Sequence, residues 1–475
     1  MNILLINPPT ANAIQSEVPS WVKKETGVFP PLGLLYLAAF ARQNTRHDIA
    51  LFDSVAENND YGKLRQSIES FRPRVVGITA HTHNLVDVIQ TAEMAKRIDS
   101  SILVCIGGPH TEVFPRQTAR FSEVDFVLTG EAERTFCRLL KAIEYDSGYD
   151  EVGGLYFRRG EDVVEIPGQE PVPDLDSLPF PERDRLKQHH YFYALGHKAF
   201  FTTLATTRGC PFHCTFCSSG GKKHRARSPE NVVDEIETCL GLGIEEIHFI
   251  DDTFNVSMER VTRICEEILR RKLKLKWTCR PRGRGFSREI MELLKKAGCV
   301  RIQIGVETGS DEGLEKLQKG ITIEDAEKTV SFARAAGITS MAYFLIGCPH
   351  EKSEKDIRKT LEFSLKLDPT YCLFNILTPY PGTAVFEEGV ARGLFEEDVW
   401  EKFAVAPAKD FVAPVWDEFL SREDLFRLLE LAYKKFYLRP RVVWRDLKQM
   451  RSWKPLGRRI KTGLIMLTSG KKRKV

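Results

Sequence analysis

The strongest constraint on the fold is an alternation of short apolar segments with longer helix-patterned segments, which occurs twice along the 475 residues. In the N-terminal third, the apolar runs are rich in β-branched residues, and the segments between them have helical spacing. The predicted strands are residues 3–6, 49–52, 75–79, 102–106 and 126–129. Strands that are apolar throughout are buried on both faces, as in parallel sheets covered by crossover helices. We therefore predict an α/β fold in which residues 1–142 form a Rossmann-like, doubly wound parallel sheet.

The alternation resumes in the second half of the chain, after a segment of different composition. Residues 143–195 are rich in Gly, Pro and acids and contain GGLYFRRGEDVVEI, which predicts a small hairpin followed by an irregular linker. Residues 196–405 then alternate again. The predicted strands are residues 202–206, 246–251, 274–279, 301–307, 340–346 and 371–377. Six parallel strands with outer helices predict a partial (β/α)6 barrel, with its chemistry at the carboxyl ends of the strands.

The C-terminal region, residues 406–475, differs from both α/β segments. Residues 421–437 have the apolar spacing of an amphipathic helix. From Lys434 onward the chain contains 15 Lys and Arg against a single acid, Asp446. This excess is larger than the net charge of +4 for the whole chain, so the rest of the chain is net negative. We expect a helical region with a basic tail that has a partner of its own.

The cysteine content bears on the compartment and the chemistry. No run of eighteen apolar residues occurs, and the N-terminus MNILLINPP lacks the basic region and cleavage site of a signal peptide, which predicts a cytoplasmic protein. Thiols stay reduced there, so clustered cysteines indicate metal or redox chemistry rather than disulfides. Most of the eleven cysteines lie singly in apolar segments and are expected to be buried hydrophobic side chains.

Three cysteines are clustered. The segment TTRGCPFHCTFCSSG places Cys210, Cys214 and Cys217 in CxxxCxxC spacing, in the loop after the first predicted barrel strand. A structural zinc site is one interpretation, but it needs a fourth ligand, for which His213 and His224 are available. Three thiolates on a cubane iron–sulfur cluster instead leave one iron open to a further ligand, which favours chemistry over structure.

This segment resembles the radical S-adenosylmethionine (SAM) superfamily, in which a CxxxCxxC loop follows the first strand of a partial barrel. The resemblance extends over about 200 residues. It implies a [4Fe-4S] cluster on the three cysteines, with the methionine group of SAM on the open iron and reductive cleavage to a 5′-deoxyadenosyl radical. It also implies an electron donor such as flavodoxin or ferredoxin. The protein itself positions these cofactors.

The resemblance also assigns five SAM contacts at strand ends: Asp251, Asp252, Arg280, Glu307 and Gly347. A carboxylate in HFIDDTFN would accept hydrogen bonds from the methionine ammonium, although either aspartate also suits a helix cap. Glu307 resembles the ribose contact of the family, and Gly347 would permit close backbone approach to adenine. Arg280 either touches the methionine carboxylate or lies on the surface.

The N-terminal sheet resembles the cobalamin-binding domain that precedes the barrel in cobalamin-dependent radical SAM enzymes. The resemblance rests on NPP, PPLGLLYLAAFAR, IGGPHT and LTGEAE, in that order, over roughly residues 1–140. The cobalamin contacts that it implies are Thr79, Gly107, Gly108, His110, Gly130 and Glu131. The two consecutive glycines would let the backbone lie against a large flat ring. His110 is either a cobalt ligand or, as is more usual after GGP, a hydrogen-bonding residue of the loop.

The histidine pattern of cobalt-ligating cobalamin domains is absent. In the motif DxHxxG an aspartate lies two residues before the histidine, and none of the eleven histidines has one there. Residues 79–84 are then expected to pack beneath the ring and to leave cobalt five-coordinate or bound to water.

Together these features predict a cobalamin-dependent radical SAM enzyme with a small-molecule substrate. The leading interpretation is a methyltransferase acting on an unactivated carbon, with a ring-forming or oxidative cyclase as the alternative in the same class. An alternative of another class is a nucleotide-binding regulatory protein with a structural metal loop, which leaves the position of the cysteine loop unexplained.

The composition of the basic tail suggests that it binds a membrane surface. Trp444, Trp453 and the apolar GLIML lie among its positive charges, as in segments that bind the surface of an anionic membrane. A peripheral position on the inner face of the membrane would suit a lipid-like substrate. Nucleic-acid binding and a solvated tail that aids solubility are the competing interpretations.

Overall fold

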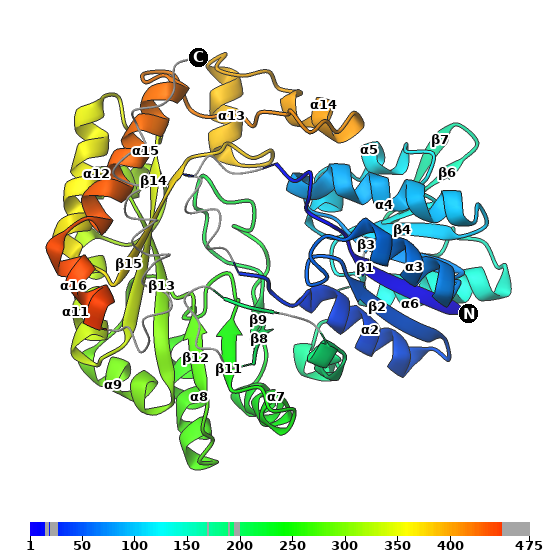
Figure 1. Cartoon of the computed structure of the whole chain (residues 1–475), viewed down its shortest axis with the longest axis horizontal. Coiled ribbons are helices and arrows are strands. Elements are labelled where there is room, and N and C mark those ends of the chain that lie inside the picture. The colour runs from blue at the N-terminus through cyan, green and yellow to red at the C-terminus, as the bar shows by residue number, and fades with distance from the viewer. Residues whose placement is uncertain (15–18, 20–26, 169–170, 189–190, 194–199, 449–475) are drawn as a thin grey trace.

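The computed structural model describes residues 1–14, 19, 27–168, 171–188, 191–193 and 200–448. Two α/β units lie side by side in Figure 1, with the barrel on the left and the N-terminal sheet on the right. Both predicted architectures are confirmed. The short helices α13 (Ala384–Ala391) and α14 (Val399–Val405) follow the barrel. Helix α14 contacts α5 (Pro115–Ala119) of the N-terminal unit.

The N-terminal sheet has seven strands in the order β2-β1-β3-β4-β5-β6-β7, and the first five are parallel. These strands are β1 (Asn2–Asn7), β2 (Asp48–Asp53), β3 (Val75–Thr79), β4 (Leu103–Gly107) and β5 (Phe126–Leu128). The hairpin predicted after residue 143 is β6 (Leu155–Arg159) and β7 (Asp162–Ile166). It extends this sheet, because β6 pairs antiparallel with β5.

Helices cover both faces of this sheet, as the doubly wound prediction requires. The helices α2 (Leu32–Asn44) and α6 (Ala132–Tyr145) pack on one face. The other face is covered by α3 (Tyr61–Phe71), α4 (Leu85–Ile98) and α5 (Pro115–Ala119). The central strands have no exposed apolar face, which explains their continuous apolar sequences.

The second unit is a six-stranded parallel sheet in the order β15-β14-β13-β12-β11-β8, which follows the order along the chain. Its strands are β8 (Phe201–Leu204), β11 (Glu246–Phe249), β12 (Lys276–Cys279), β13 (Cys299–Glu307), β14 (Thr339–Ile346) and β15 (Tyr371–Ile376). The outer helices are α7 (Pro229–Gly241), α8 (Met258–Arg270), α9 (Arg288–Lys296), α10 (Asp311–Lys316), α11 (Ile323–Ala335) and α12 (Glu354–Leu367). Since β8 and β15 do not pair, the barrel is partial.

The predicted amphipathic helix is α15 (Arg422–Tyr437), and its apolar face is part of the barrel core. Tyr433 Oη lies 3.0 Å from the carbonyl oxygen of Phe374, and Tyr437 Oη lies 2.7 Å from that of Cys372. These bonds attach α15 to the open edge at β15, which pairs with no described strand other than β14. The final described helix is α16 (Pro440–Lys448). The basic segment 449–475 lies outside the described residues. Among the described helices, none is long and apolar enough to cross a membrane.

Candidate active site

The cysteine loop projects from the end of the first barrel strand. Two short antiparallel strands, β9 (Thr207–Arg208) and β10 (Arg225–Ala226), pair at its base. Gly209 has φ +81°, and a Cβ there would lie 2.3 Å from the carbonyl oxygen of Lys223, so the loop needs glycine at this turn. The ribbon thus fixes where the loop begins and ends.

The three predicted cluster ligands lie in this loop. Cys210 is buried, with its Sγ 3.5 Å from Thr253 Oγ1, whereas Cys217 is exposed. Surrounding protein atoms nevertheless raise the pKa of the Cys217 thiol, and the neighbouring Cys214 and Cys210 raise it further. Among the described residues, no three ligating side chains are arranged to hold a single metal ion. Thiolates of a cubane bind separate iron atoms, so the donor set fits a cluster.

A cation beside the loop was not anticipated from the sequence. Arg282, after β12, is buried, and both terminal nitrogens lie 3.9 Å from Cys214 Sγ. Its guanidinium stacks 3.8 Å from the centre of the Phe212 ring. Arg280, which was predicted, is exposed. In the sequence, the only signal for Arg282 is its position two residues after Arg280, in the segment RPRGRG.

The two predicted aspartates differ in their surroundings. Asp251 is buried and accepts hydrogen bonds from Thr206 N, Thr206 Oγ1 and Thr207 N at 2.6–2.7 Å. It therefore ties the end of β11 to the end of β8. Asp252 is exposed and lies near Lys222 and Arg280, although surrounding protein atoms raise the pKa of its carboxyl group. Asp252 is the carboxylate that is accessible to a ligand.

Glu307 ends β13 in an unusual backbone conformation, with φ +69° and a register shift against β14. Its carboxylate folds back over Gly305, where a Cβ would lie 2.1 Å from Glu307 Oε1. Lys319 Nζ donates to that oxygen at 2.6 Å. Strain in a non-glycine residue persists only when its surroundings hold it, and such residues gather at functional sites.

Gly347, with φ +74°, directly follows β14 and lies next to Leu425 of α15. The buried Glu351 accepts hydrogen bonds from the backbone N–H groups of Gly347 and Cys348 at 2.8 and 3.0 Å. Burial raises the pKa of Glu351 to about 7. This carboxyl group, which the sequence did not single out, holds the predicted adenine-facing turn in place.

The cobalamin-side residues lie at the carboxyl ends of β3, β4 and β5. Gly108 has φ +113°, and a Cβ there would lie 2.8 Å from the carbonyl oxygen of Ala80, so the loops after β3 and β4 touch. Gly107 ends β4, Thr79 ends β3, and Gly130 follows β5 with φ +61°. This edge of small residues fits a flat ring system laid against it.

Three histidines gather at the same edge. His110 is buried, and its Nδ1 lies 3.0 Å from Thr82 Oγ1, while its Nε2 has no hydrogen-bond partner among the described residues. His81 and His83 are exposed on either side of Thr82, with ring centroids 5.3 Å apart. The exposed imidazoles and the unpaired nitrogen are polar groups that a bound cofactor could satisfy.

Glu131, also predicted at the cobalamin side, faces the barrel. Its Oε2 accepts from Arg208 Nη1 at 2.8 Å, and its Oε1 accepts from Arg225. Arg208 also donates to Glu133 Oε1 at 2.6 Å. Both oxygens of the carboxylate are thus bound by arginines of the ribbon beneath the cysteine loop.

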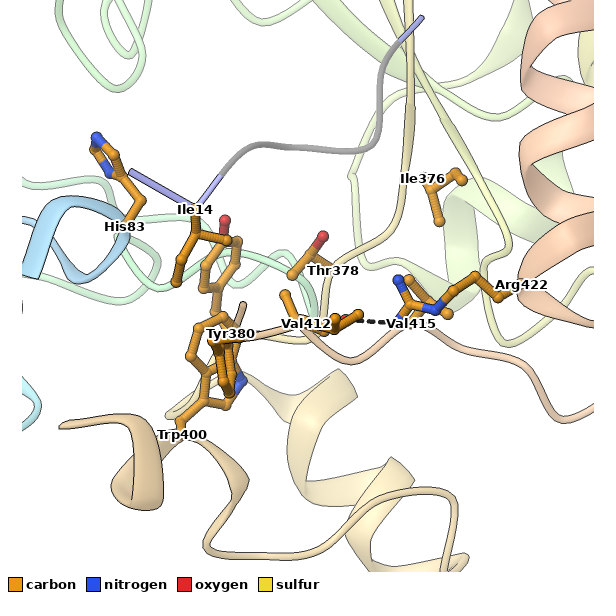
Figure 2. A pocket seen from close by; sticks show the side chains of 11 residues that line it. Ile14, His83, Ile376, Thr378, Tyr380, Trp400, Val412, Val415 and Arg422 are labelled. Atoms are coloured by element: carbon orange, nitrogen blue, oxygen red, sulfur yellow. Dashed lines mark hydrogen bonds between the residues drawn. The ribbon is translucent and has the colours of Figure 1, made fainter. Parts of the chain in front are cut away.

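A cavity of about 160 Å³ lies between the two units. It is lined by Ile14, His83, Ile376, Thr378, Tyr380, Trp400, Phe411, Val412, Ala413, Val415 and Arg422. Figure 2 shows Ile14 of the N-terminal unit beside Tyr380, which follows β15, with His83 at the outer rim. Tyr380 stacks on Trp400 with ring centroids 5.3 Å apart, and Trp400 Nε1 donates to the carbonyl oxygen of Pro379 at 2.9 Å. Most of the lining residues are apolar or aromatic, and His83, Thr378 and Arg422 add polar groups.

Comparison with known proteins identifies both units. The family model of the B12 binding domain matches residues 22–140, and that of the radical SAM superfamily matches residues 204–364. An uncharacterized methyltransferase of Pyrococcus horikoshii is 35% identical, over 94% of this chain and 95% of the relative. The anaerobic magnesium-protoporphyrin IX monomethyl ester cyclase of Rubrivivax gelatinosus is 26% identical, over 87% of this chain and 74% of the relative.

A solved structure has the same fold. The radical SAM methyltransferase TsrM from Kitasatospora setae, with cobalamin and a [4Fe-4S] cluster bound, superimposes with a TM-score of 0.66 at 22% identity. The match covers 82% of this chain and 75% of TsrM. A B12 binding domain followed by a radical SAM domain excludes the alternative interpretation, a regulatory protein with a structural metal loop. The chain belongs to the cobalamin-dependent radical SAM enzymes, whose cofactors are a [4Fe-4S] cluster, SAM and cobalamin.

Proposed function

We propose that the protein transfers a methyl group to an unactivated carbon of an apolar small molecule. The observation that carries this proposal is the cavity between the two cofactor-binding units, which is lined by side chains from both units. We infer that a substrate held between the two units is within reach of both cofactors, and such positioning can account for much of a reaction barrier.

In this proposal, residues at the carboxyl edge of the barrel bind the cluster and SAM, and residues at the carboxyl edge of the N-terminal sheet bind cobalamin. When bound, the cofactors supply a reductively generated radical and a carrier for the methyl group. Cys210, Cys214 and Cys217 hold the cluster. SAM is bound by Asp252, Arg280, Glu307 and Gly347, with Asp251 holding the strand ends beneath it. Thr79, Gly107, Gly108 and Gly130 form the edge against which cobalamin lies.

The cavity favours an apolar substrate group. At about 160 Å³ it takes a ring or a short chain segment rather than a whole drug-sized molecule. Tyr380 is 45% exposed and is supported from below by Trp400, so it offers a fixed aromatic face. A lipid-like molecule, with one segment in the cavity and the rest outside, fits this lining.

The test uses the reconstituted enzyme with cobalamin, a low-potential reductant and SAM carrying a CD3 group. We expect 5′-deoxyadenosine, S-adenosylhomocysteine and cobalamin that carries the CD3 label, each detected by mass spectrometry. Formation of 5′-deoxyadenosine with no label in cobalamin would reject methyl transfer.

Formation of 5′-deoxyadenosine without labelled cobalamin would favour the cyclase alternative. Its specific support is the group of relatives named as magnesium-protoporphyrin IX monomethyl ester cyclases, which are 26–27% identical over 87% or more of this chain. A cyclase would consume SAM without moving its methyl group, so the fate of CD3 separates the two functions.

Two partners belong to this proposal. The cluster needs a one-electron donor such as flavodoxin or ferredoxin. A lipid-like substrate would be reached from the inner face of the membrane, through α16 and the basic segment beyond it. Trp444 and Val443 on α16 are 61% and 45% exposed, whereas the apolar face of α15 is buried against β15 and is not available to a membrane.

Liposome sedimentation tests the membrane contact. Each Lys or Arg near an anionic surface contributes about 1 kcal/mol, so full-length protein should sediment with phosphatidylglycerol vesicles at low salt. Protein ending at Leu438 retains α15 but lacks α16 and the basic segment, and should remain in the supernatant. Equal sedimentation of both forms, or of neither, would reject the membrane contact.

A further inference from the structure

The ion cluster formed by Glu131, Glu133, Arg208 and Arg225, here called the inter-domain clamp, joins the two cofactor-binding edges at one point. Glu131 follows β5 and is the residue before α6, at the carboxyl edge of the N-terminal sheet. Arg208 and Arg225 are directly opposite each other in the β9–β10 ribbon. The clamp therefore holds the base of the cysteine loop, and Arg208 is two residues before Cys210.

The geometry of the clamp is specific. One carboxylate binds two guanidinium groups through different oxygens, and Arg208 uses its second nitrogen on Glu133. Arg208 also lies 5.4 Å from the centre of the Tyr36 ring, and Arg225 donates to the carbonyl oxygen of Val172. Charge-assisted bonds in a fork of this kind fix orientation as well as distance.

Burial distinguishes the clamp from an ordinary surface ion pair. The exposed fractions of the four side chains are 8–23%. A further ion pair, outside the clamp, joins Lys222 of the cysteine loop to Glu112 of the N-terminal unit, but its side chains are 51% and 37% exposed. Exposed pairs contribute little because water screens them and both side chains lose entropy. The clamp and this exposed pair thus differ in burial while joining the same two units.

We propose that Glu131 is a positioning residue that couples occupation of the cobalamin edge to the placement of the cluster-binding loop. Gly130, at the cobalamin edge, is its immediate neighbour in the chain, and Cys210 is two residues from its arginine partner. A change in the loop after β5 on cobalamin binding is passed through two ion pairs to the cysteine loop. This inference rests on the cofactors of the family and does not depend on the identity of the substrate.

Hydrogen exchange measures this coupling without turnover. Protein with its [4Fe-4S] cluster in place but free of cobalamin is compared before and after addition of hydroxocobalamin. In the wild type we expect exchange in residues 207–226 to slow by about tenfold, as for a coupling of ordinary size between two sites. In Glu131→Gln the slowing should fall below about twofold, while hydroxocobalamin still binds.

Matched variants separate coupling from folding. Glu112→Gln removes the exposed pair that spans the same units and should keep the wild-type response. Arg225→Gln breaks the clamp from the barrel side and should lose the response as Glu131→Gln does, so one misfolded variant cannot decide the result. Iron content and circular dichroism should match the wild type in all three. A full response in Glu131→Gln or Arg225→Gln, or an equal loss in Glu112→Gln, would overturn the assignment.

Discussion

The carboxyl edges of the two sheets are prepared for their ligands in opposite ways. On the barrel edge, Asp251 and Glu307 already have hydrogen-bond or ion-pair partners within the chain, and Gly347 is held by Glu351. On the cobalamin edge, His81 and His83 are exposed and His110 Nε2 has no partner among the described residues. The barrel edge is preorganised by its own contacts, whereas the cobalamin edge leaves polar groups for a ligand to satisfy.

The largest effect should follow loss of a cluster ligand on the barrel edge. Replacing Cys210, Cys214 or Cys217 by Ala should abolish the cluster absorbance and the formation of 5′-deoxyadenosine, because the remaining thiols are buried elsewhere. Cys137→Ala, which removes a buried thiol of the N-terminal core, is the control and should retain both. Retention of cluster and cleavage in any of the three ligand variants would contradict the assignment.

The neighbouring aspartates should separate stability from binding. Asp251→Asn puts an amide where three donors converge, and a poorly satisfied buried donor costs about 1–3 kcal/mol in the free energy of unfolding. Asp252→Asn lies on the exposed side and should change stability by less than about 0.5 kcal/mol, yet weaken SAM binding. Urea unfolding and calorimetric titration with SAM check the pair. A larger loss of stability in Asp252→Asn would reverse the roles given to the two residues.

Glu351 makes the preorganised edge sensitive to pH. Burial raises its pKa to about 7, above the value of about 4.3 for an exposed glutamate. The folded protein therefore binds this proton more tightly than the unfolded chain, and the contribution to stability is full below about pH 4 and is lost as pH rises through 7.

Wild type and Glu351→Gln should thus differ in their pH dependence. Relative to the variant, the wild type should lose about 2–4 kcal/mol of unfolding free energy between pH 4.5 and pH 8. Glu362→Gln, an exposed position on α12, should follow the wild type. Parallel curves for wild type and Glu351→Gln in urea unfolding would show that Glu351 does not carry this dependence.

The sequence predicted the helices and strands better than the contacts between them. Periodicity placed the strands of both sheets and helix α15, because each buried face imposes its own spacing. The same pattern could not show that α15 closes the edge at β15, or that the 155–166 hairpin joins the first sheet, because both depend on pairing between distant segments. The partners of Glu131 and Glu307 were missed for the same reason, since Arg208 is 77 residues and Lys319 12 residues away.

The smallest effect is expected at the cobalamin edge, in the electron paramagnetic resonance spectrum of the cob(II)alamin form. Without DxHxxG, the cobalt lines should show no nitrogen superhyperfine splitting, and His110 is buried behind Thr82, to which its Nδ1 is bonded. His81→Ala and His83→Ala should then leave the spectrum unchanged while weakening cobalamin binding, because each removes a polar group from the exposed edge. Gln66→Ala, at an exposed position on α3, is a control for substitution at the surface of the same domain. A splitting in the wild type that disappears in His81→Ala or His83→Ala would instead assign that histidine to cobalt and show that this edge provides a metal ligand as well as a surface.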